Sequence, residues 1–382
     1  MTNGGKIRIC HVVNIISGKS DGVYAHLRML FQHLDKGKFE QFLVFQGDPA
    51  IEKEVRELGV TVFVLPGLKR RFSIAALAQL YAIVKAHRVD IIQAHLLKPY
   101  VMVGAVNTVL RKKAIFNYHG SFIRNREYYT FAEEAVYRLA HLIVYTCRSY
   151  QRVVVPSQAS KRILLDETHL LPPVEVYYDG ISRESCIAGR DDAPDTIRRL
   201  APERHRIGIV SRFEPEKRID VALQIARELL SRRSDVHFFI LGDGELEARM
   251  RRLASELGLA DGVTFLGYLP DAQKYLPAFD AVLITSDREG LPFLVWEAMA
   301  KGVPIVAPYV GGIGEIIEQE HCGKLFGRRN VPEAVSILDD LLNDGAMREE
   351  MGKRGRSAIE KKYNEQAFAK RFQSIYSELV NS

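Results

Sequence analysis

The sequence of 382 residues contains little cysteine and no long apolar run. Its four cysteines, Cys10, Cys147, Cys186 and Cys322, are scattered, a spacing that excludes a paired-cysteine metal motif and favours a reducing environment. No uninterrupted apolar segment approaches the roughly 20 residues that a membrane-spanning helix needs. The first residues also lack the apolar core of a signal peptide. We therefore expect a cytoplasmic protein that is neither secreted nor integral to a membrane.

Several motifs of nucleotide and metal chemistry are absent as well. The sequence has no Gly-x-x-x-x-Gly-Lys-Ser/Thr, which argues against NTP hydrolysis. It has no Cys/His cluster and no Asp-x-Asp after an apolar strand, so we expect neither a metal nor another cofactor. The acidic pairs Asp191-Asp192 and Asp339-Asp340 are interpreted as solvated. No nucleic-acid recognition module is present, so nucleic acid is not an expected partner.

The charge is distributed unevenly along the chain. Residues 1–180 carry 24 Lys and Arg against 15 Asp and Glu, whereas residues 181–382 carry 29 against 32. The first half is therefore basic and the second slightly acidic. A chain of this length is too long for one ordinary core, which favours two domains.

Apolar strand-like runs alternate with helical periodicity through most of the chain, a pattern typical of parallel sheets. The polar region 182–202 interrupts it. We predict an α/β fold of two doubly wound, Rossmann-like domains facing a central cleft: residues 1–182, a linker at 183–203, and residues 204–364. The strands expected in the first domain are Ile7–Val13, Gln41–Phe45, Thr61–Leu65, Asp90–Ala94, Ala114–Tyr118, Leu142–Thr146 and Arg152–Val155.

The stretch 287–307 is the most informative part of the sequence. It follows the apolar run Ala281–Thr285 and contains a predicted helix that ends at Gly302. Glu289 is expected on the loop before this helix and Glu297 about a turn and a half inside it. Both acids would lie near a helix N-terminus at the carboxyl end of a parallel strand, where doubly wound sheets bind nucleotides. Two carboxylates there can hold hydroxyls of a sugar and of a ribose.

Basic residues and glycines follow other strands of the second domain. Arg212 and Lys217 lie on the loop after the strand Arg206–Val210, where they would neutralise a diphosphate. A solvated charged turn is the alternative. Gly311-Gly312, before a predicted helix Glu315–Glu320, would turn backbone amides toward phosphate, or form an ordinary glycine turn.

The first domain offers histidines at the ends of its strands. His119 follows the strand Ala114–Tyr118 and is interpreted as a catalytic or sugar-contacting residue. His95 is the second candidate, whereas His11 and His141 are interpreted as core or surface residues. Gly22, in the loop after the first strand, would allow a ligand to approach the backbone closely.

These residues together resemble glycosyltransferase family 4, retaining enzymes of the glycosyltransferase B (GT-B) fold. Glu289 and Glu297 match its Glu-x7-Glu motif, within the signature Glu289-Gly290-Leu291-Pro292…Glu297-Ala-Met-Ala-x-Gly-x-Pro. Arg212, Lys217, the Gly311-Gly312 turn, His119 and Gly22 also match the family pattern, and the likeness covers essentially the whole chain.

The resemblance implies a function and a set of roles. The chain would transfer a sugar, with retention and without a metal, from a nucleotide-diphosphate sugar to a saccharide or lipid-linked acceptor. Glu289 and His119 would contact the transferred sugar and Glu297 the ribose. Arg212 and Lys217 would contact the diphosphate, with Gly22, Gly290, Leu291, Pro292, Gly311 and Gly312 lining the donor site. The helix 365–382 would pack back on the first domain.

Some positions depart from the family pattern. Asp21 precedes Gly22 where a Gly-Gly pair is common, Asp179 stands where Asn is usual, and Arg218 stands where Gly is frequent. A nucleotide-sugar epimerase and a non-catalytic nucleotide-sugar-binding subunit remain as alternatives. Basic segments of the first domain, at 69–71, 111–113 and 124–126 with Phe72 and Tyr128-Tyr129, predict docking on an anionic membrane surface, with solvated loops as the alternative.

Overall fold

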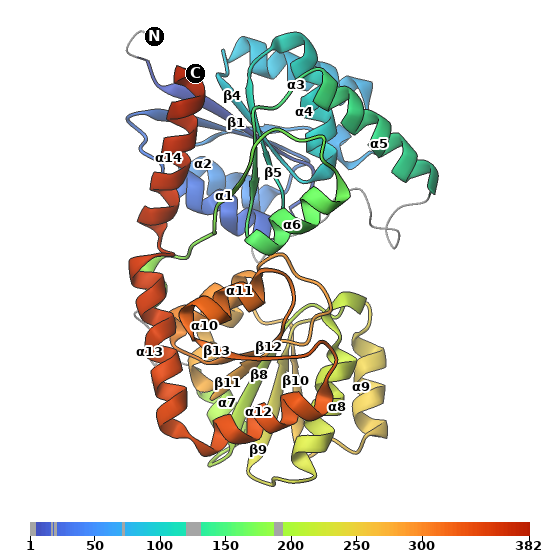
Figure 1. Ribbon diagram of the computed structural model, residues 1–382, viewed down its shortest axis with the longest axis vertical. Helices are drawn as coiled ribbons and strands as arrows, with labels where there is room; N and C mark the ends of the chain where they lie inside the picture. The colour runs from blue at the N-terminus through green and yellow to red at the C-terminus, as the bar shows by residue number, and fades with distance from the viewer. Residues whose placement is uncertain (1–4, 17, 19–20, 71–72, 120–130, 187–193) are drawn as a thin grey trace. The chain divides into compact units, whose positions relative to one another are not determined.

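The computed structural model describes residues 5–16, 18, 21–70, 73–119, 131–186 and 194–382, and only the backbone of 131–137. The chain forms two compact units, Met1–Asp179 with Glu365–Ser382, and Gly180–Asn364 (Figure 1). Each unit contains one parallel sheet with helices between successive strands. This confirms the predicted α/β class with two doubly wound, Rossmann-like domains.

The first unit is built on a seven-stranded sheet in the order β3-β2-β1-β4-β5-β6-β7. The strand order reverses direction at β1, which pairs in parallel with both β2 and β4. Its strands are β1 (Ile7–Val13), β2 (Phe39–Phe45), β3 (Thr61–Val64), β4 (Ile91–His95), β5 (Lys113–Asn117), β6 (Arg152–Val155) and β7 (Val174–Val176).

The second unit has a six-stranded sheet in the order β10-β9-β8-β11-β12-β13. Here the order reverses at β8, which pairs in parallel with β9 and β11. Its strands are β8 (His205–Val210), β9 (Val236–Leu241), β10 (Val263–Gly267), β11 (Ala281–Leu283), β12 (Ile305–Pro308) and β13 (Gly323–Phe326). In such sheets, ligands bind at the carboxyl ends of the strands beside the reversal point.

The helices connect these strands and cover the sheets (Figure 1). Those of the first unit are α1 (Gly22–His33), α2 (Pro49–Glu57), α3 (Ile74–Ala86), α4 (Leu97–Leu110), α5 (Phe131–Thr146), α6 (Gln158–Glu167) and α14 (Glu365–Asn381). Those of the second are α7 (Asp195–Leu200), α8 (Ile219–Leu230), α9 (Glu247–Glu256), α10 (Phe293–Lys301), α11 (Gly311–Glu320), α12 (Val331–Asn343) and α13 (Gly345–Lys361).

The C-terminal helix α14 belongs to the first unit although the residues before it belong to the second. Its apolar face, at Phe368, Phe372, Ile375, Tyr376 and Leu379, joins a core cluster with residues of α1, β1 and β4. The helical spacing of these positions creates that face, and burying it attaches the end of the chain to the first sheet.

Three sequence predictions differ from the structure. The segment 142–146, predicted as a strand, forms the last turns of α5, where His141 and Val144 are buried at helical spacing. The chain passes between units at residues 179–180 and 364–365, while the described part of the predicted linker 183–203 belongs to the second unit, where Ile197 is fully buried. The helix predicted at Glu315–Glu320 begins earlier, at Gly311.

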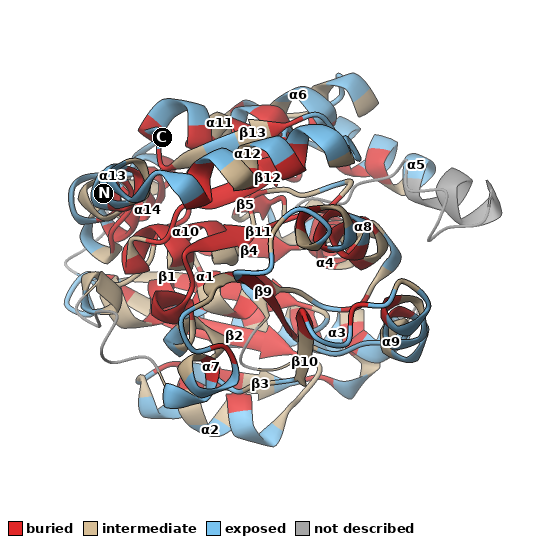
Figure 2. Ribbon diagram, turned by 90° about the horizontal axis from the view of Figure 1, so that it is seen from below, coloured by how far each residue is buried: buried red, intermediate tan, exposed pale blue. Residues whose placement is uncertain are grey.

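The strands of both sheets are largely buried, whereas the helices expose their outer faces (Figure 2). Among the described residues, no helix is sufficiently long and apolar to cross a bilayer.

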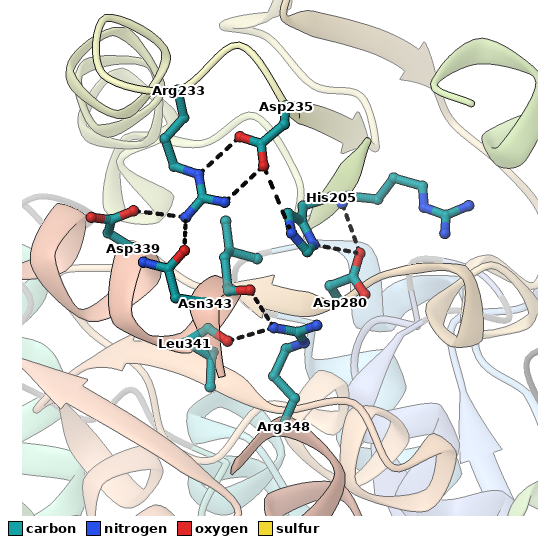
Figure 3. Close-up of polar contacts among 10 residues, drawn as sticks. His205, Arg233, Asp235, Asp280, Asp339, Leu341, Asn343 and Arg348 are labelled. Carbon is teal, nitrogen blue, oxygen red and sulfur yellow. Dashed lines mark hydrogen bonds and ion pairs between the residues drawn. The ribbon is translucent and has the colours of Figure 1, made fainter. Parts of the chain in front are cut away.

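Ion pairs join the amino-terminal ends of strands in the second sheet (Figure 3). The guanidinium of Arg233 contacts Asp235, just before β9, and Asp339 of α12, each at 2.8 Å. His205, at the start of β8, lies 3.9 Å from both Asp235 and Asp280. Asp339, which the sequence predicted to be solvated, is thus paired. The network stabilises the end of the sheet opposite to the strand ends that carry the candidate site.

Candidate active site

The acidic pair lies as the sequence predicted. Glu289 is on the loop between β11 and α10, and Glu297 is in the second turn of α10. Pro292 is the residue that caps the start of α10, and Gly302 ends the helix with a φ of +65°. The left-handed conformation at Gly302 is one that glycine adopts without steric strain. The loop, the helix and its end are therefore specified by local sequence.

Lys217 and Glu289 come together at the carboxyl end of the second sheet. Lys217 Nζ lies 2.8 Å from Glu289 Oε1, and their side chains are only 17% and 10% exposed. Thr285, which follows β11, donates its hydroxyl to the backbone carbonyls of Lys217 and Arg218, at 3.0 Å. This hydroxyl ties the loop after β8 to the end of β11, so backbone contacts as well as charge position the lysine beside the glutamate.

Arg218 has a structural role that the sequence analysis missed. Its φ of +51° is in the left-handed region, which explains why glycine suits this position. The Arg218 guanidinium contacts Asp220 and Asp287, and Asp287 also pairs with Arg329. Arg329 and Arg218 hold the pKa of Asp287 below its usual range. Arg218, at a position where glycine is frequent, thus forms ion pairs that hold the loop preceding Glu289.

The Gly311-Gly312 segment packs directly against the backbone of the loop that carries Glu289 and Gly290. These glycines form the first turn of α11, whereas the sequence predicted a turn before a helix at 315. A Cβ at Gly311, whose φ is +52°, would lie 1.8 Å from the carbonyl oxygen of Glu289. The amide of Gly312 donates to the carbonyl of Gly290 at 2.6 Å. Only glycine at 311 permits this close approach.

A pocket with an accessible volume of about 110 Å³ lies at these strand ends. Its polar lining includes Arg212, Lys217, Glu289 and Ser286, and its apolar lining includes Pro292 and Leu294. The Arg212 side chain is 64% exposed and is paired with Glu214. The structure therefore brings Arg212, Lys217, Glu289 and Pro292 into one pocket, while Gly290, Leu291 and Glu297 are outside its lining.

Glu297 has an unusual electrostatic environment. Burial raises the pKa of its carboxyl group to about 7, although the neighbouring Lys301 acts in the opposite direction. Desolvation favours the neutral acid, so near neutral pH the group is divided between its protonated and ionised forms. A carboxyl group in this state responds to any ligand that prefers one form.

The remaining predicted residues are in the first unit. Gly22 is the first residue of α1, where the carboxylate of Asp21 accepts hydrogen bonds from the amides of Val23 and Tyr24. His119 follows β5, with a partly exposed side chain. Desolvation and the nearby His26 lower the pKa of His119 to about 3, so its imidazole is neutral near pH 7.

His119 belongs to a cluster of histidines that the sequence analysis did not find. His95 Nδ1 lies 3.1 Å from His119 Nε2, and His11 Nδ1 lies 3.4 Å from His95 Nε2. One ring nitrogen each of His26, His95 and His119 are within 4.8 Å of one another, a grouping that could hold a metal ion. The expectation of no histidine cluster was therefore wrong, because residues far apart in sequence, on β1, on α1, at the end of β4 and after β5, meet in the first unit.

The fold and these motifs define the class of GT-B glycosyltransferases, and comparisons with known sequences agree. Residues 20–185 match the family described as Glycosyltransferase Family 4, and residues 195–358 match Glycosyl transferases group 1. The chain belongs to this family of glycosyltransferases, and the predicted resemblance is confirmed.

Three individual proteins illustrate the likeness. Poly(ribitol-phosphate) alpha-N-acetylglucosaminyltransferase of Staphylococcus aureus is 27% identical over 45% of this chain and 35% of its own length. An uncharacterised glycosyltransferase of Methanocaldococcus jannaschii is 23% identical over 94% of this chain and 95% of its own. The crystal structure of Anabaena HepE with UDP has a TM-score of 0.78 and 21% identity, over 98% of this chain and 100% of that one.

The extent of these matches varies. The matched regions span only 35–50% of the length of three curated relatives, including the staphylococcal enzyme. At 21% identity, the similarity to HepE concerns the fold.

Proposed function

We propose that this protein is a retaining glycosyltransferase that needs no metal. It transfers a sugar from a nucleotide-diphosphate sugar to a saccharide or lipid-linked acceptor, in the synthesis of a cell-surface polysaccharide or glycolipid. The observation that carries this proposal is the 2.8 Å contact between Lys217 and Glu289 in a pocket at the strand ends. The presence of UDP in HepE and the polymer substrate named for the staphylococcal relative support the donor and acceptor classes.

Each candidate residue at these strand ends has a proposed task. Lys217 and Arg212 bind the diphosphate and neutralise the charge that develops as it leaves the sugar. When phosphate oxygens approach, they compete with Glu289 for the Lys217 ammonium. The Glu289 carboxylate then becomes available to accept hydrogen bonds from hydroxyls of the transferred sugar. The Glu297 carboxylate accepts hydrogen bonds from hydroxyls of the ribose. Gly311 and Gly312 present their backbone to the nucleotide at the start of α11.

Product analysis with and without an acceptor tests this function. Purified protein is incubated with a panel of nucleotide sugars, and both nucleoside diphosphate and sugar products are measured. The proposal predicts that nucleoside diphosphate release increases when a saccharide acceptor is added. Conversion of the free nucleotide sugar to an isomer without an acceptor would instead identify an epimerase. Donor binding with neither reaction would identify a non-catalytic subunit.

We also propose that the protein is cytoplasmic and docks on an anionic membrane surface through its first unit. Lys69, Arg70 and Arg111 are exposed, while Arg71, Phe72, 124–126 and Tyr128-Tyr129 lie outside the described residues. Three apolar residues of helix α5, Leu139, Leu142 and Ile143, have exposed fractions of 61%, 44% and 49%. Exposed apolar residues beside basic side chains suit the interface of an anionic bilayer.

Vesicle co-sedimentation distinguishes this docking from solvated loops. We expect the protein to pellet with vesicles containing phosphatidylglycerol and to remain in solution with pure phosphatidylcholine. Leu142→Glu should weaken pelleting, and Leu200→Glu, at an exposed leucine of the second unit, serves as the matched control. Pelleting that does not depend on anionic lipid would contradict the proposal.

A further inference from the structure

A chain of buried hydrogen bonds connects the C-terminal helix to His119. Tyr376 of α14 contacts Gln93 Oε1, and Gln93 Nε2 lies 3.1 Å from Asn117 Oδ1. Asn117 Nδ2 in turn lies 3.1 Å from His26 Nε2 and 3.4 Å from His119 Nε2. Tyr376, Gln93 and Asn117 are at most 3% exposed. Because bulk solvent does not reach these groups, a donor among them that lacks an acceptor would be destabilising.

The direction of this chain is set at Tyr376. Complete burial raises the pKa of Tyr376 well above its ordinary value, so the phenol keeps its proton. That single proton is donated to Gln93 Oε1. If the Gln93 amide were reversed, its NH2 group could donate to the Tyr376 oxygen, but the Tyr376 proton would have no acceptor among the described residues. Leaving such a group unsatisfied costs about 1–3 kcal/mol.

The orientation of Gln93 determines the next two links. Its amide group donates to Asn117 Oδ1, so Asn117 Nδ2 faces the two imidazoles with both of its protons. A nitrogen that accepts a hydrogen bond carries no proton. His26 Nε2 and His119 Nε2 are therefore both unprotonated.

The other contacts of the histidines agree with this assignment. His26 Nδ1 lies 2.5 Å from Asp179 Oδ1, where a protonated nitrogen is required because an ionised carboxylate only accepts. His95 Nδ1 lies 3.1 Å from the unprotonated His119 Nε2 and donates to it. His95 Nε2 then accepts from His11 Nδ1, at 3.4 Å. This arrangement of protons gives each of these histidine contacts one donor and one acceptor, and it leaves His11 Nε2 buried without a hydrogen-bond partner among the described residues.

We infer that Tyr376, Gln93 and Asn117 are positioning residues that hold His119 as its neutral Nδ1-protonated tautomer. His119 Nδ1 has no hydrogen-bond partner among the described residues, and the residue as a whole is partly exposed. It presents one N–H donor, which suits an oxygen of the transferred sugar or of the acceptor, and it does not act as a general base through Nε2. The catalytic use of this donor rests on the proposed function.

Nitrogen-15 NMR of histidine-labelled protein tests the tautomer directly. Long-range proton–nitrogen spectra distinguish protonated from unprotonated ring nitrogens, and His119→Gln identifies the signals of His119. We expect a protonated Nδ1 and an unprotonated Nε2 from pH 6 to pH 8. A proton on Nε2 at pH 7 would overturn the inference. The measurement requires no substrate, so it can succeed or fail independently of glycosyl transfer.

Asn117→Asp tests the link between the network and the reaction. A carboxylate at this position can only accept, whereas the Asn117 amide donates, so His119 should become protonated on Nε2 and donate to it. Turnover should fall by about tenfold or more, with a smaller change in KM for the donor. Asn107→Asp is the matched control, because Asn107 is another buried asparagine of this unit whose amide donates to backbone carbonyls. If the tautomer of His119 is unchanged in Asn117→Asp, the inference that Asn117 sets this tautomer is contradicted.

Discussion

Lys217 Nζ lies 2.8 Å from Glu289 Oε1, although 72 residues separate them in the sequence. Both side chains are mostly buried at the carboxyl end of the second sheet. The pair combines a cation that suits a diphosphate with a carboxylate that suits sugar hydroxyls. In the proposed function, a donor that carries both kinds of group replaces this contact.

Replacing either member of this pair should greatly reduce turnover. We expect Lys217→Ala and Glu289→Ala each to lower kcat by on the order of 100-fold or more, since each removes charge stabilisation from the site. The double variant should lose less than the product of the two, because the residues act as a unit. Lys274→Ala is the control, as Lys274 forms an exposed pair with Asp271. Near-normal turnover in either single variant would contradict the assigned roles.

Gly311→Ala should impair donor binding through the backbone of the acidic loop. The added methyl group would clash with the Glu289 carbonyl, so the loop must move. Gly258→Ala is a matched control: its φ of +70° imposes similar strain, but no atom lies within 4 Å of the added group. We expect both variants to lose about 1 kcal/mol of stability from the strained backbone, and only Gly311→Ala to lose turnover. Equal activity in the two variants would exclude the contact.

Donor binding should release a proton from Glu297. Because its pKa is raised to about 7, part of the protein holds a neutral carboxyl group at pH 6.5. A ribose whose hydroxyls prefer the carboxylate lowers that pKa, so affinity should fall as the pH drops below 7, by at most about tenfold per unit. Calorimetry in buffers of different ionisation enthalpy measures the proton release. Glu297→Gln should abolish it, and buffer-independent heats in the unmodified protein would count against this role.

The histidine cluster should make the first unit sensitive to acid. Desolvation lowers the pKa of His11 to about 3, below the value near 6.5 of an unfolded chain. The unfolded state therefore binds more protons between these values. The contribution of His11 to the free energy of unfolding is complete above pH 6.5. It declines toward pH 3 by up to about 1.4 kcal/mol per pH unit. His95, whose pKa is also lowered well below its ordinary value, acts in the same direction.

Urea unfolding at pH 7, 6 and 5 measures this dependence. In His11→Gln the free energy of unfolding should decline less steeply as the pH falls. His169→Gln, at an exposed position in the same unit, should leave this decline unchanged. A decline that is identical in the two variants would show that the pKa of His11 is the same in the folded and unfolded states, which would contradict the prediction.

Local sequence was sufficient to predict the region around Glu289 and Glu297. A buried strand, a loop, a helix start and a terminal glycine follow one another there, and each has a recognisable residue pattern. The start of α11 was placed too late because Gly311 and Gly312 are poor helix formers. Their contact with Glu289 and Gly290, which depends on tertiary structure, holds them there.

Other features depend on contacts between distant residues. Leu142–Thr146 is a short apolar run that suits a strand or a buried helix equally, and its α5 neighbours decide the outcome. His11, His26, His95 and His119 come from four separate segments, so their spacing carries no cluster signal. The boundary at Asp179 was hidden because polar composition marked residues 182–202, whereas the described part of that region packs within the second unit.

The most direct test of the donor site is the thermal stability of the protein with nucleotide-diphosphate sugars. A ligand that binds the folded state raises the unfolding temperature by mass action. UDP-, GDP-, ADP- and dTDP-sugars are compared at equal concentration in the unmodified protein, Lys217→Ala and Lys274→Ala. The Lys217–Glu289 site predicts that at least one donor stabilises the unmodified protein and Lys274→Ala, and that Lys217→Ala loses this shift. Equal stabilisation of Lys217→Ala, or no stabilisation by any donor, would contradict it.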